Sequence, residues 1–173
     1  MGQSPREKMK LLLKVLILSA ACILIIKSCS PFLNVPNPLI GQPAPDFTLT
    51  KVSGQEANMT QYRGGQPAMI FFWATWCPHC RRQLKELTQN RQAIEANGIK
   101  IILVNIGESS QKVREYVNAN NISSDIFMDE AAETADRYKI VGVPTFFFIN
   151  REGIVLEVKN VLPGDYQKIL FSR

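Results

Sequence analysis

The sequence predicts an α/β domain with a mixed central sheet that helices cover on both faces. Two near-continuous apolar runs, residues 68–74 and 99–106, have the composition of buried parallel strands. A helical pattern over residues 77–97 lies between them and makes a strand–helix–strand crossover. Later in the chain, the turn at 150–153 joins two further strands and predicts an antiparallel hairpin. A crossover followed by a hairpin gives a sheet with strands of both orientations.

The other elements follow in chain order, and residues 41–173 have the length of one compact domain. The domain is expected to open on an N-terminal β-hairpin, in which a tight turn joins two short strands. Gly98 is expected to end the first long helix. The elements expected outside the crossover are strands 47–50 and 56–58 with the turn 52–55, helix 112–120, strand 126–128, helix 131–138, strands 145–149 and 154–158, and helix 165–171.

An apolar segment, residues 11–27, precedes the domain and follows a basic tail, residues 1–10. Its length is close to the lower limit of about 17 residues for a membrane-spanning helix. Because basic flanks stay in the cytoplasm, we expect a transmembrane signal anchor with the tail inside and the domain outside. Two other interpretations stay open. One is a signal peptide cleaved near residues 19–21, and the other is lipid attachment at Cys22 or Cys29.

Residues 28–40 are expected to form a semi-rigid, proline-rich spacer between anchor and domain. Most of the formal net charge of +5 belongs to the membrane end. Residues 1–30 hold five basic side chains and one acidic one, which leaves 15 basic and 14 acidic side chains in the rest of the chain. The high isoelectric point therefore reflects the flank of the anchor. The domain has no basic patch with interleaved aromatic residues, which is the pattern that predicts nucleic-acid binding.

The residues best equipped for chemistry are Cys77 and Cys80, which two residues separate where the strand 68–74 turns into a helix. Thiolates attack disulfides, and the free N–H groups at a helix N-terminus favour the thiolate form of Cys77. Cys80 lies one helical turn further on and can close a disulfide with it. Pro78 suits the first helical turn. His79, the only histidine of the chain, can add a positive charge or a donor near the Cys77 sulfur.

Three other uses of the cysteine pair stay open on the residues alone. A structural zinc site would need further ligands, for which Cys22, Cys29 and His79 are the candidates. A structural disulfide would gain little from closing so short a loop. A copper(I) site can be built on the same thiolates. Copper-binding assembly factors usually add a distant histidine, however, and this chain has only His79.

Four segments together resemble the thioredoxin superfamily and, within it, the TlpA/ResA-like, membrane-anchored thiol-disulfide oxidoreductases. They are residues 41–49 (GQPAPDFTL), 62–64 (YRG), 72–80 (FWATWCPHC) and 142–145 (GVPT). The resemblance covers residues 41–173 and implies a thioredoxin-like domain, and the anchor and the spacer fit the same family.

The resemblance also implies a role for each residue of the site. Cys77 would be the attacking, exposed sulfur, and Cys80 the buried sulfur that resolves the mixed disulfide. Pro144 would follow a cis peptide bond, so that the backbone of Val143 pairs with an incoming polypeptide. Trp76 would pack around the turn that carries the cysteines.

The family context implies an enzyme whose substrates are protein thiols and disulfides. The redox-active disulfide would need no cofactor or metal, and a membrane redox partner would reset it. We expect a monomer in a bacterial inner membrane, with one span and with the domain facing the periplasm or the cell exterior. A peroxidase of the peroxiredoxin type is a further alternative. Trp73 and Ile70 stand where such an enzyme needs threonine and proline.

The direction of electron flow stays open. Related reductants often keep a carboxylate three residues after the second cysteine, where this chain has Gln83. Thioredoxin has an aspartate six residues before the first cysteine, where this chain has Phe71. The dipeptide Pro78-His79 is that of DsbA-like oxidants, and a histidine there should stabilise the thiolate and make the disulfide more oxidising. Both a reductase, as in cytochrome c maturation, and an oxidant are therefore candidates, and these residues favour the oxidant.

Overall fold

A computed structural model describes residues 36–171, together with Arg6, Met9 and Lys14. The chain divides into two units, residues 1–36 and 37–173, and each is considered by itself. Apart from these three residues, the expected basic tail and anchor lie outside the described residues, as does most of the proline-rich spacer. Within the described part, no helix is both long enough and apolar enough to cross a membrane.

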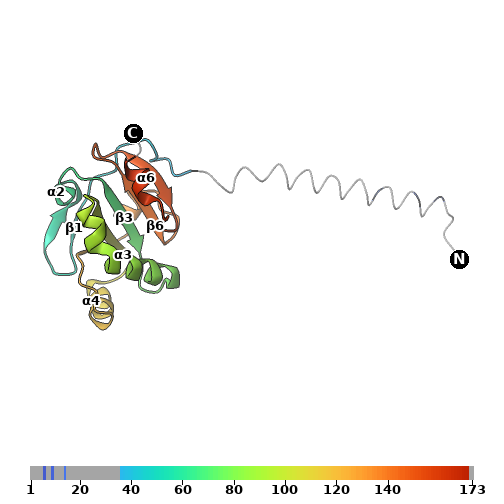
Figure 1. Ribbon diagram of the computed structural model, residues 1–173. Helices are drawn as coiled ribbons and strands as arrows, with labels where there is room; N and C mark the ends of the chain where they lie inside the picture. Colours follow the sequence, from blue (N-terminus) through green and yellow to red (C-terminus); the bar gives the residue numbers. More distant parts are fainter. Residues whose placement is uncertain (1–5, 7–8, 10–13, 15–35, 172–173) are drawn as a thin grey trace. The chain divides into compact units, whose positions relative to one another are not determined.

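The second unit alternates strands and helices, and Figure 1 shows helices α3 and α6 in front of the central strands. In chain order the elements are β1 (Thr48–Thr50), β2 (Glu56–Asn58), α2 (Met59–Arg63), β3 (Ala68–Trp73), α3 (Pro78–Ala96), β4 (Lys100–Ile106), α4 (Ser110–Ala119), β5 (Ile126–Asp129), α5 (Glu133–Arg137), β6 (Thr145–Ile149), β7 (Val155–Lys159) and α6 (Tyr166–Phe171).

Five strands form one mixed sheet in the order β5-β4-β3-β6-β7. Strand β4 pairs in parallel with β3 and with β5, whereas β6 pairs antiparallel with β3 and with β7. The crossover through α3 places β4 beside β3, and the turn at 150–153 folds β7 back onto β6. The mixed sheet that the sequence predicts is therefore confirmed.

The central strand β3 separates the hydrophobic core into two layers. All of its residues are buried, and they alternate between the two faces of the sheet. Met69, Phe71 and Trp73 belong to the cluster under α3, α4 and α6. Ile70 and Phe72 belong to the cluster on the other face, under the N-terminal hairpin and α2. Each large apolar side chain buried in this way contributes about 1.5–3 kcal/mol, so β3 is a rigid support for the turn that follows it.

The predicted N-terminal hairpin is present, with β1 antiparallel to β2. Helix α2 follows it at once and was not predicted, because five residues are too few to show a helical period. Both of its caps are nevertheless present in the sequence. The Asn58 side chain accepts a hydrogen bond from the Gln61 N–H at 3.0 Å, and Gly64 ends the helix with left-handed backbone at φ 61°.

Two helices begin at other residues than expected. Helix α4 begins at Ser110, two residues early, because the Ser109 side chain caps it and accepts a hydrogen bond from the Lys112 N–H at 3.4 Å. Helix α5 begins at Glu133, two residues late. Ala132 before it has left-handed backbone at φ 60°, which a right-handed helix cannot continue through.

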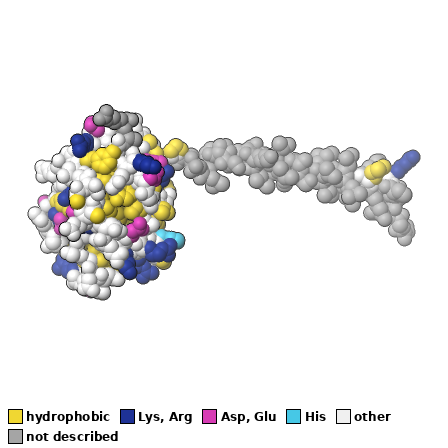
Figure 2. Space-filling model, in the orientation of Figure 1, with side chains coloured by type: hydrophobic (Ala, Val, Ile, Leu, Met, Phe, Trp, Pro, Cys, Tyr) yellow, Lys and Arg dark blue, Asp and Glu magenta, His cyan; other side chains and the backbone are white. Residues whose placement is uncertain are grey.

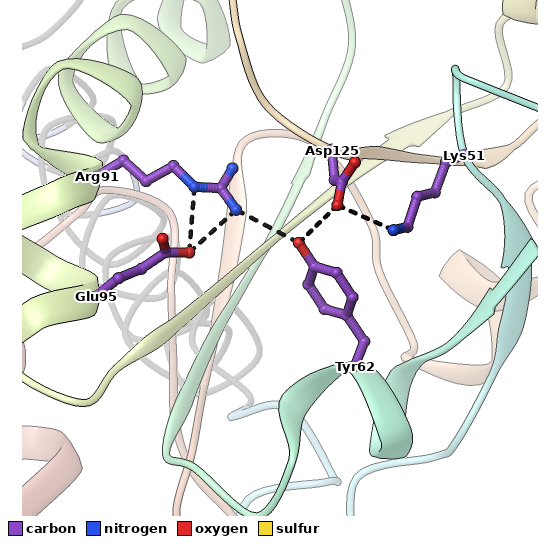
Figure 3. Close-up of polar contacts among 5 residues, drawn as sticks. All are labelled: Lys51, Tyr62, Arg91, Glu95 and Asp125. Carbon is purple, nitrogen blue, oxygen red and sulfur yellow. Dashed lines mark hydrogen bonds and ion pairs between the residues drawn. The ribbon is translucent and has the colours of Figure 1, made fainter. Parts of the chain in front are cut away.

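A polar network fastens the N-terminal hairpin and α2 to the rest of the domain (Figure 3). Lys51, just after β1, pairs with Asp125 at 2.9 Å, and the Tyr62 hydroxyl donates to the same carboxylate at 3.1 Å. On the other side, Arg91 of α3 donates to the Tyr62 hydroxyl at 3.4 Å and pairs with Glu95 at 3.0 Å. Residues of α2 and α3 are thereby joined with the residue just after β1 and the residue just before β5 in one chain of polar contacts.

The segment that leads into the domain runs along the outer edge of β7. The Gly41 N–H donates to the Val155 carbonyl at 2.7 Å, and the Val155 N–H donates to the Gln42 carbonyl at 2.9 Å. The Ala44 N–H donates to the Gly153 carbonyl at 2.9 Å. Because β7 is the last strand of the sheet, these bonds satisfy backbone groups that no other strand reaches.

Candidate active site

Strand β3 leads through residues 74–77, here named the active-site turn, into helix α3. Cys77 is the residue that caps the helix, with extended backbone at φ −85°, and its sulfur accepts a hydrogen bond from the Cys80 N–H at 3.2 Å. Pro78 takes the first helical position, where no N–H is needed. The Cys77 sulfur therefore stands where a capping oxygen usually does, beside the unpaired N–H groups of the first turn.

The two cysteines are free thiols that differ in exposure. Cys77 is 4% exposed and Cys80 is 0% exposed. Cys77 is thus much less exposed than the resemblance implies, although it is the more accessible of the two. Burial, and then hydrogen bonding to Cys77, raises the pKa of the Cys80 thiol to about 12. Cys80 therefore holds its proton at neutral pH.

The loop before β6 faces the active-site turn. Its Val143–Pro144 peptide bond is cis. The Cys77 thiol donates to the Val143 carbonyl, with 3.7 Å between sulfur and oxygen. The Asn160 side chain donates to the Pro144 carbonyl at 2.9 Å and so ties the loop to the end of β7. Within the described residues the Val143 N–H has no hydrogen-bond partner, which leaves it available to another chain.

Trp76 does not pack into the turn; it lies on the surface, 65% exposed. With Val143 it lines a shallow pocket of about 250 Å³ beside the active-site turn. Val141, which lines the same pocket, is fully exposed. Large apolar side chains left in water next to a reactive thiol are typical of a contact surface for another molecule.

His79 contacts a cation one turn further along the helix. Its Nδ1 lies 2.7 Å from Nη2 of Arg82. A guanidinium has donors alone, so Nδ1 is the acceptor in this contact. The i,i+3 spacing of the two residues on a helix could have indicated this contact.

The two positions where related proteins carry acids are filled here by residues with structural contacts. The Gln83 side-chain oxygen accepts a hydrogen bond from the Leu162 N–H at 3.0 Å, which fastens α3 to the segment before α6. Phe71 stacks on Phe146, with 4.3 Å between ring centroids. Within the part of the chain that the structure describes, no carboxylate forms a hydrogen bond with Cys80.

A buried carboxylate that the sequence analysis missed holds the active-site turn in place. Glu108, in the loop after β4, is 6% exposed. It accepts hydrogen bonds from the N–H and from the hydroxyl of Thr75, both at 2.6 Å, and from the Asn105 amide at 2.9 Å. Lys112 pairs with it at 2.8 Å. Burial alone would raise the pKa of Glu108, but these partners outweigh it and hold the pKa below its ordinary value.

The position of Glu108 follows from the sheet. Strands β3 and β4 are parallel, with Trp73 in register with Asn105. The loops after two adjacent parallel strands lie at the same sheet edge, so the loop after β4 lies beside the active-site turn. Polar residues just past one buried strand, next to a motif at the end of its neighbour, are the signal that could have found this carboxylate.

The arrangement is suited to thiol–disulfide exchange. It combines a slightly exposed sulfur at a helix N-terminus, a fully buried second sulfur one turn away and an open backbone donor on the facing loop. The side chains near the turn that could ligate a metal are the two cysteines, His79 and Glu108. Among the described residues, no three His, Cys, Asp or Glu side chains gather in a group that could hold a metal ion.

Known proteins are similar to this chain in sequence and in fold. The family model described as the AhpC/TSA family matches residues 40–158. The thiol-disulfide oxidoreductase ResA of Geobacillus kaustophilus is 30% identical over 129 residues, which cover 75% of this chain and 72% of that protein. The sporulation thiol-disulfide oxidoreductase A of Bacillus subtilis is 27% identical over 116 residues, which cover 65% of this chain and 69% of that protein.

A solved structure agrees with these relatives. The thioredoxin-family thiol:disulfide interchange protein of Chlorobium tepidum matches with a TM-score of 0.63 and 25% identity, over 79% of this chain and 95% of that one. The five-stranded mixed sheet with its flanking helices is therefore a thioredoxin-like fold. The chain belongs to the AhpC/TSA family of thioredoxin-like proteins and is a homologue of the ResA-type thiol-disulfide oxidoreductases.

Proposed function

We propose that this protein exchanges disulfides with protein substrates through Cys77 and Cys80, and that its disulfide is more oxidising than that of reductants in the family. The observation that carries the proposal is the asymmetry of the pair. Cys77 opens α3 and faces the Val143 carbonyl at 3.7 Å, whereas Cys80 is fully buried with its pKa raised to about 12. Cys77 is therefore the sulfur that reacts with substrates, and Cys80 is the one that closes the disulfide.

In the oxidising direction a substrate thiolate attacks Cys77 of the disulfide. A bond forms between the substrate sulfur and the Cys77 sulfur, the bond to Cys80 breaks, and Cys80 takes up a proton. A second substrate thiolate then attacks the substrate sulfur of the mixed disulfide and releases Cys77. Two electrons and two protons pass from the substrate dithiol to the cysteine pair. The disulfide of a membrane redox partner takes them up and resets the pair.

Charges around Cys77 support the oxidising direction. The thiolate exists only in the reduced pair, so a group that stabilises the thiolate also stabilises the dithiol form and raises the reduction potential. The Cys80 N–H, in the first turn of α3, donates to the Cys77 sulfur at 3.2 Å, and Arg81 and Arg82 follow directly. Gln83 and Phe71 place no negative charge at the positions where related proteins carry acids.

The facing loop and the exposed apolar residues support a polypeptide as substrate. The open Val143 N–H can pair with an extended segment as a short added strand. Trp76 and Val141 offer apolar contact on the same side of the turn. The cis Val143–Pro144 bond lies at this docking position.

We also propose a place in the cell for this reaction. The tail 1–10 would stay in the cytoplasm, residues 11–27 would anchor the chain in a bacterial inner membrane, and residues 28–40 would space the domain from it. The domain 41–173 would then work as a monomer in the periplasm or at the cell exterior. The support for this arrangement is the basic tail followed by the apolar segment in the sequence.

Redox titration of the full chain against glutathione tests the proposed direction. We expect a potential well above the about −270 mV of thioredoxin and closer to the about −120 mV of DsbA. His79→Ala should lower the potential, whereas Asn90→Ala, on the same helix and away from the turn, should leave it unchanged. A wild-type potential as low as that of thioredoxin would contradict the proposal.

A further inference from the structure

A groove of about 690 Å³ begins at Pro78, next to the active-site turn, and is used by none of the steps above. It lies between the N-terminal half of α3 and the C-terminal end of α4 with the loop after it, residues 120–123. Pro78 of the redox motif forms part of its wall. A molecule that reacts at Cys77 can therefore extend into this α3–α4 groove without leaving the surface.

The α3–α4 groove is strongly basic. Its described lining includes Arg81, Arg82 and Lys85 and no aspartate or glutamate. Figure 2 shows Lys and Arg side chains gathered beside the single histidine of the chain. These cations follow the positive end of the α3 dipole, where acidic side chains would be favoured instead. The fold therefore gains nothing from their positive charge at this place.

Within the described residues, the cations of the groove have no acidic partner. Neither the Arg81 nor the Lys85 side chain forms an ion pair or a hydrogen bond there, and Arg82 contacts His79. Elsewhere on the same helix, Arg91 is paired with Glu95 at 3.0 Å. An uncompensated cluster beside a reactive thiol indicates an anionic ligand from outside.

The other lining groups favour a polypeptide over a lipid surface. Gln89, Asn120 and Asn121 bring side-chain amides, which donate to and accept from peptide groups. A face that enters a membrane surface combines basic residues with exposed large apolar ones. The described lining has no exposed large apolar residue, because Tyr116 and Ile122 are half-buried.

We infer that the α3–α4 groove binds an acidic segment next to the reactive cysteine of the protein substrate. This inference rests on the proposed function, and it names the class of substrate: proteins whose redox cysteine has glutamate or aspartate residues close by in the chain. Charge complementarity would speed the encounter and hold the substrate while its cysteine reacts at Cys77.

Direct binding tests this inference apart from redox chemistry. The full chain carrying Cys77→Ser and Cys80→Ser is titrated, in neutral detergent, into two labelled peptides that differ only in four glutamates replaced by glutamines. We expect the acidic peptide to bind about tenfold more tightly at low salt, with the preference lost at high salt, because exposed charges are screened.

Matched variants locate the binding. Arg81→Gln with Lys85→Gln should weaken binding of the acidic peptide about three- to tenfold, the range expected from two exposed ion pairs. Arg82 stays in place because it contacts His79. The control, Arg151→Gln with Lys168→Gln, removes the same charges from exposed positions outside the groove and should change binding less than twofold.

Three results would overturn the inference: equal affinity for both peptides, equal loss in both double variants, or binding to phosphatidylserine vesicles that needs Arg81 and Lys85 while the acidic peptide stays unbound. The proposed function fails separately, if the wild-type chain does not exchange with hydroxyethyl disulfide, a small uncharged probe. Peptide binding and disulfide exchange are thus measured independently, and either can fail without the other.

Discussion

Helix α3 carries cations in both halves, and their surroundings differ. In the N-terminal half Arg81 and Lys85 are exposed, and the described part of the chain holds no counter-ion for them. In the C-terminal half the Arg91 side chain is 19% exposed and bonds to Glu95 and to the Tyr62 hydroxyl (Figure 3). Similar side chains thus lie in water in the N-terminal half and within the protein in the C-terminal half.

From this difference we expect the buried, paired cation of the helix to stabilise the fold and its exposed cations to be the ones that meet other molecules. A charge removed from water needs a partner, and Arg91 has two. A charge left in water needs none, so Arg81 and Lys85 contribute little to stability and are free to bind a ligand. Substitution of the cations in the N-terminal half should therefore alter reactivity or recognition. Substitution of Arg91 in the C-terminal half should alter the free energy of unfolding.

The largest effect is expected at the cysteines that begin the helix. Cys77→Ser should abolish exchange with protein disulfides, because no accessible sulfur remains to attack. Cys80→Ser should instead accumulate mixed disulfides, which non-reducing electrophoresis and mass spectrometry detect. Cys77→Ser should keep the free energy of unfolding within about 1 kcal/mol of the wild type. Mixed disulfides that accumulate in Cys77→Ser and not in Cys80→Ser would reverse the roles of the two sulfurs.

A smaller effect is expected at Glu108, which holds the start of α3 from outside the helix through Thr75. Glu108→Gln should lower the free energy of unfolding by about 1–3 kcal/mol near neutral pH, because an amide cannot accept from all the donors that surround it. Urea unfolding followed by fluorescence measures this difference.

The difference between wild type and Glu108→Gln should also depend on pH. The folded-state pKa of Glu108 lies below its ordinary value of 4.5. Its stabilising contribution is therefore complete above that ordinary value and is lost as the pH falls through the lower folded value. The gap in free energy of unfolding should shrink between about pH 6 and about pH 3. A gap that stays constant over this range would contradict the role of the ionised carboxylate.

The smallest expected effect is a difference in stability loss between substitutions at two arginines of the same helix. Arg91→Met keeps the length of the side chain and removes its bonds to Glu95 and Tyr62, which should cost about 1 kcal/mol of stability. Arg81→Met should cost less than about 0.5 kcal/mol, as for an exposed residue without partners. Urea unfolding of both variants checks the difference. Equal losses at the two positions would remove the distinction between the halves of α3.

Much of the fold is predictable because its elements depend on residues close together in sequence. The apolar run of β3, the cysteine that opens α3 and the turn at 150–153 are all local patterns, and the mixed sheet follows from their order. Helix α2 was missed because five residues carry no period, although Asn58 and Gly64 cap it. The starts of α4 and α5 differ by two residues from the expected ones, because local features set them: the Ser109 cap and the left-handed backbone of Ala132.

The site divides in a similar way between local and distant contacts. Spacing alone singles out Cys77 and Cys80, and the family resemblance singles out Pro144. The bonds from Thr75 to Glu108 and from Leu162 to Gln83 join residues 33 and 79 positions apart, and no local pattern contains them. Only the parallel pairing of β3 with β4 and the docking of the segment before α6 bring these groups together.

The segment that runs along the edge of β7 has a consequence for how this domain behaves among other proteins. An uncovered edge strand can recruit a strand from another chain, which begins aggregation. Gly41 and Ala44 occupy part of that edge with backbone bonds to Val155 and Gly153. The same residues join the domain to the stretch that precedes it. A shortened chain that starts after Ala44 would therefore lose solubility, because the segment that leads into the domain also protects it against self-association.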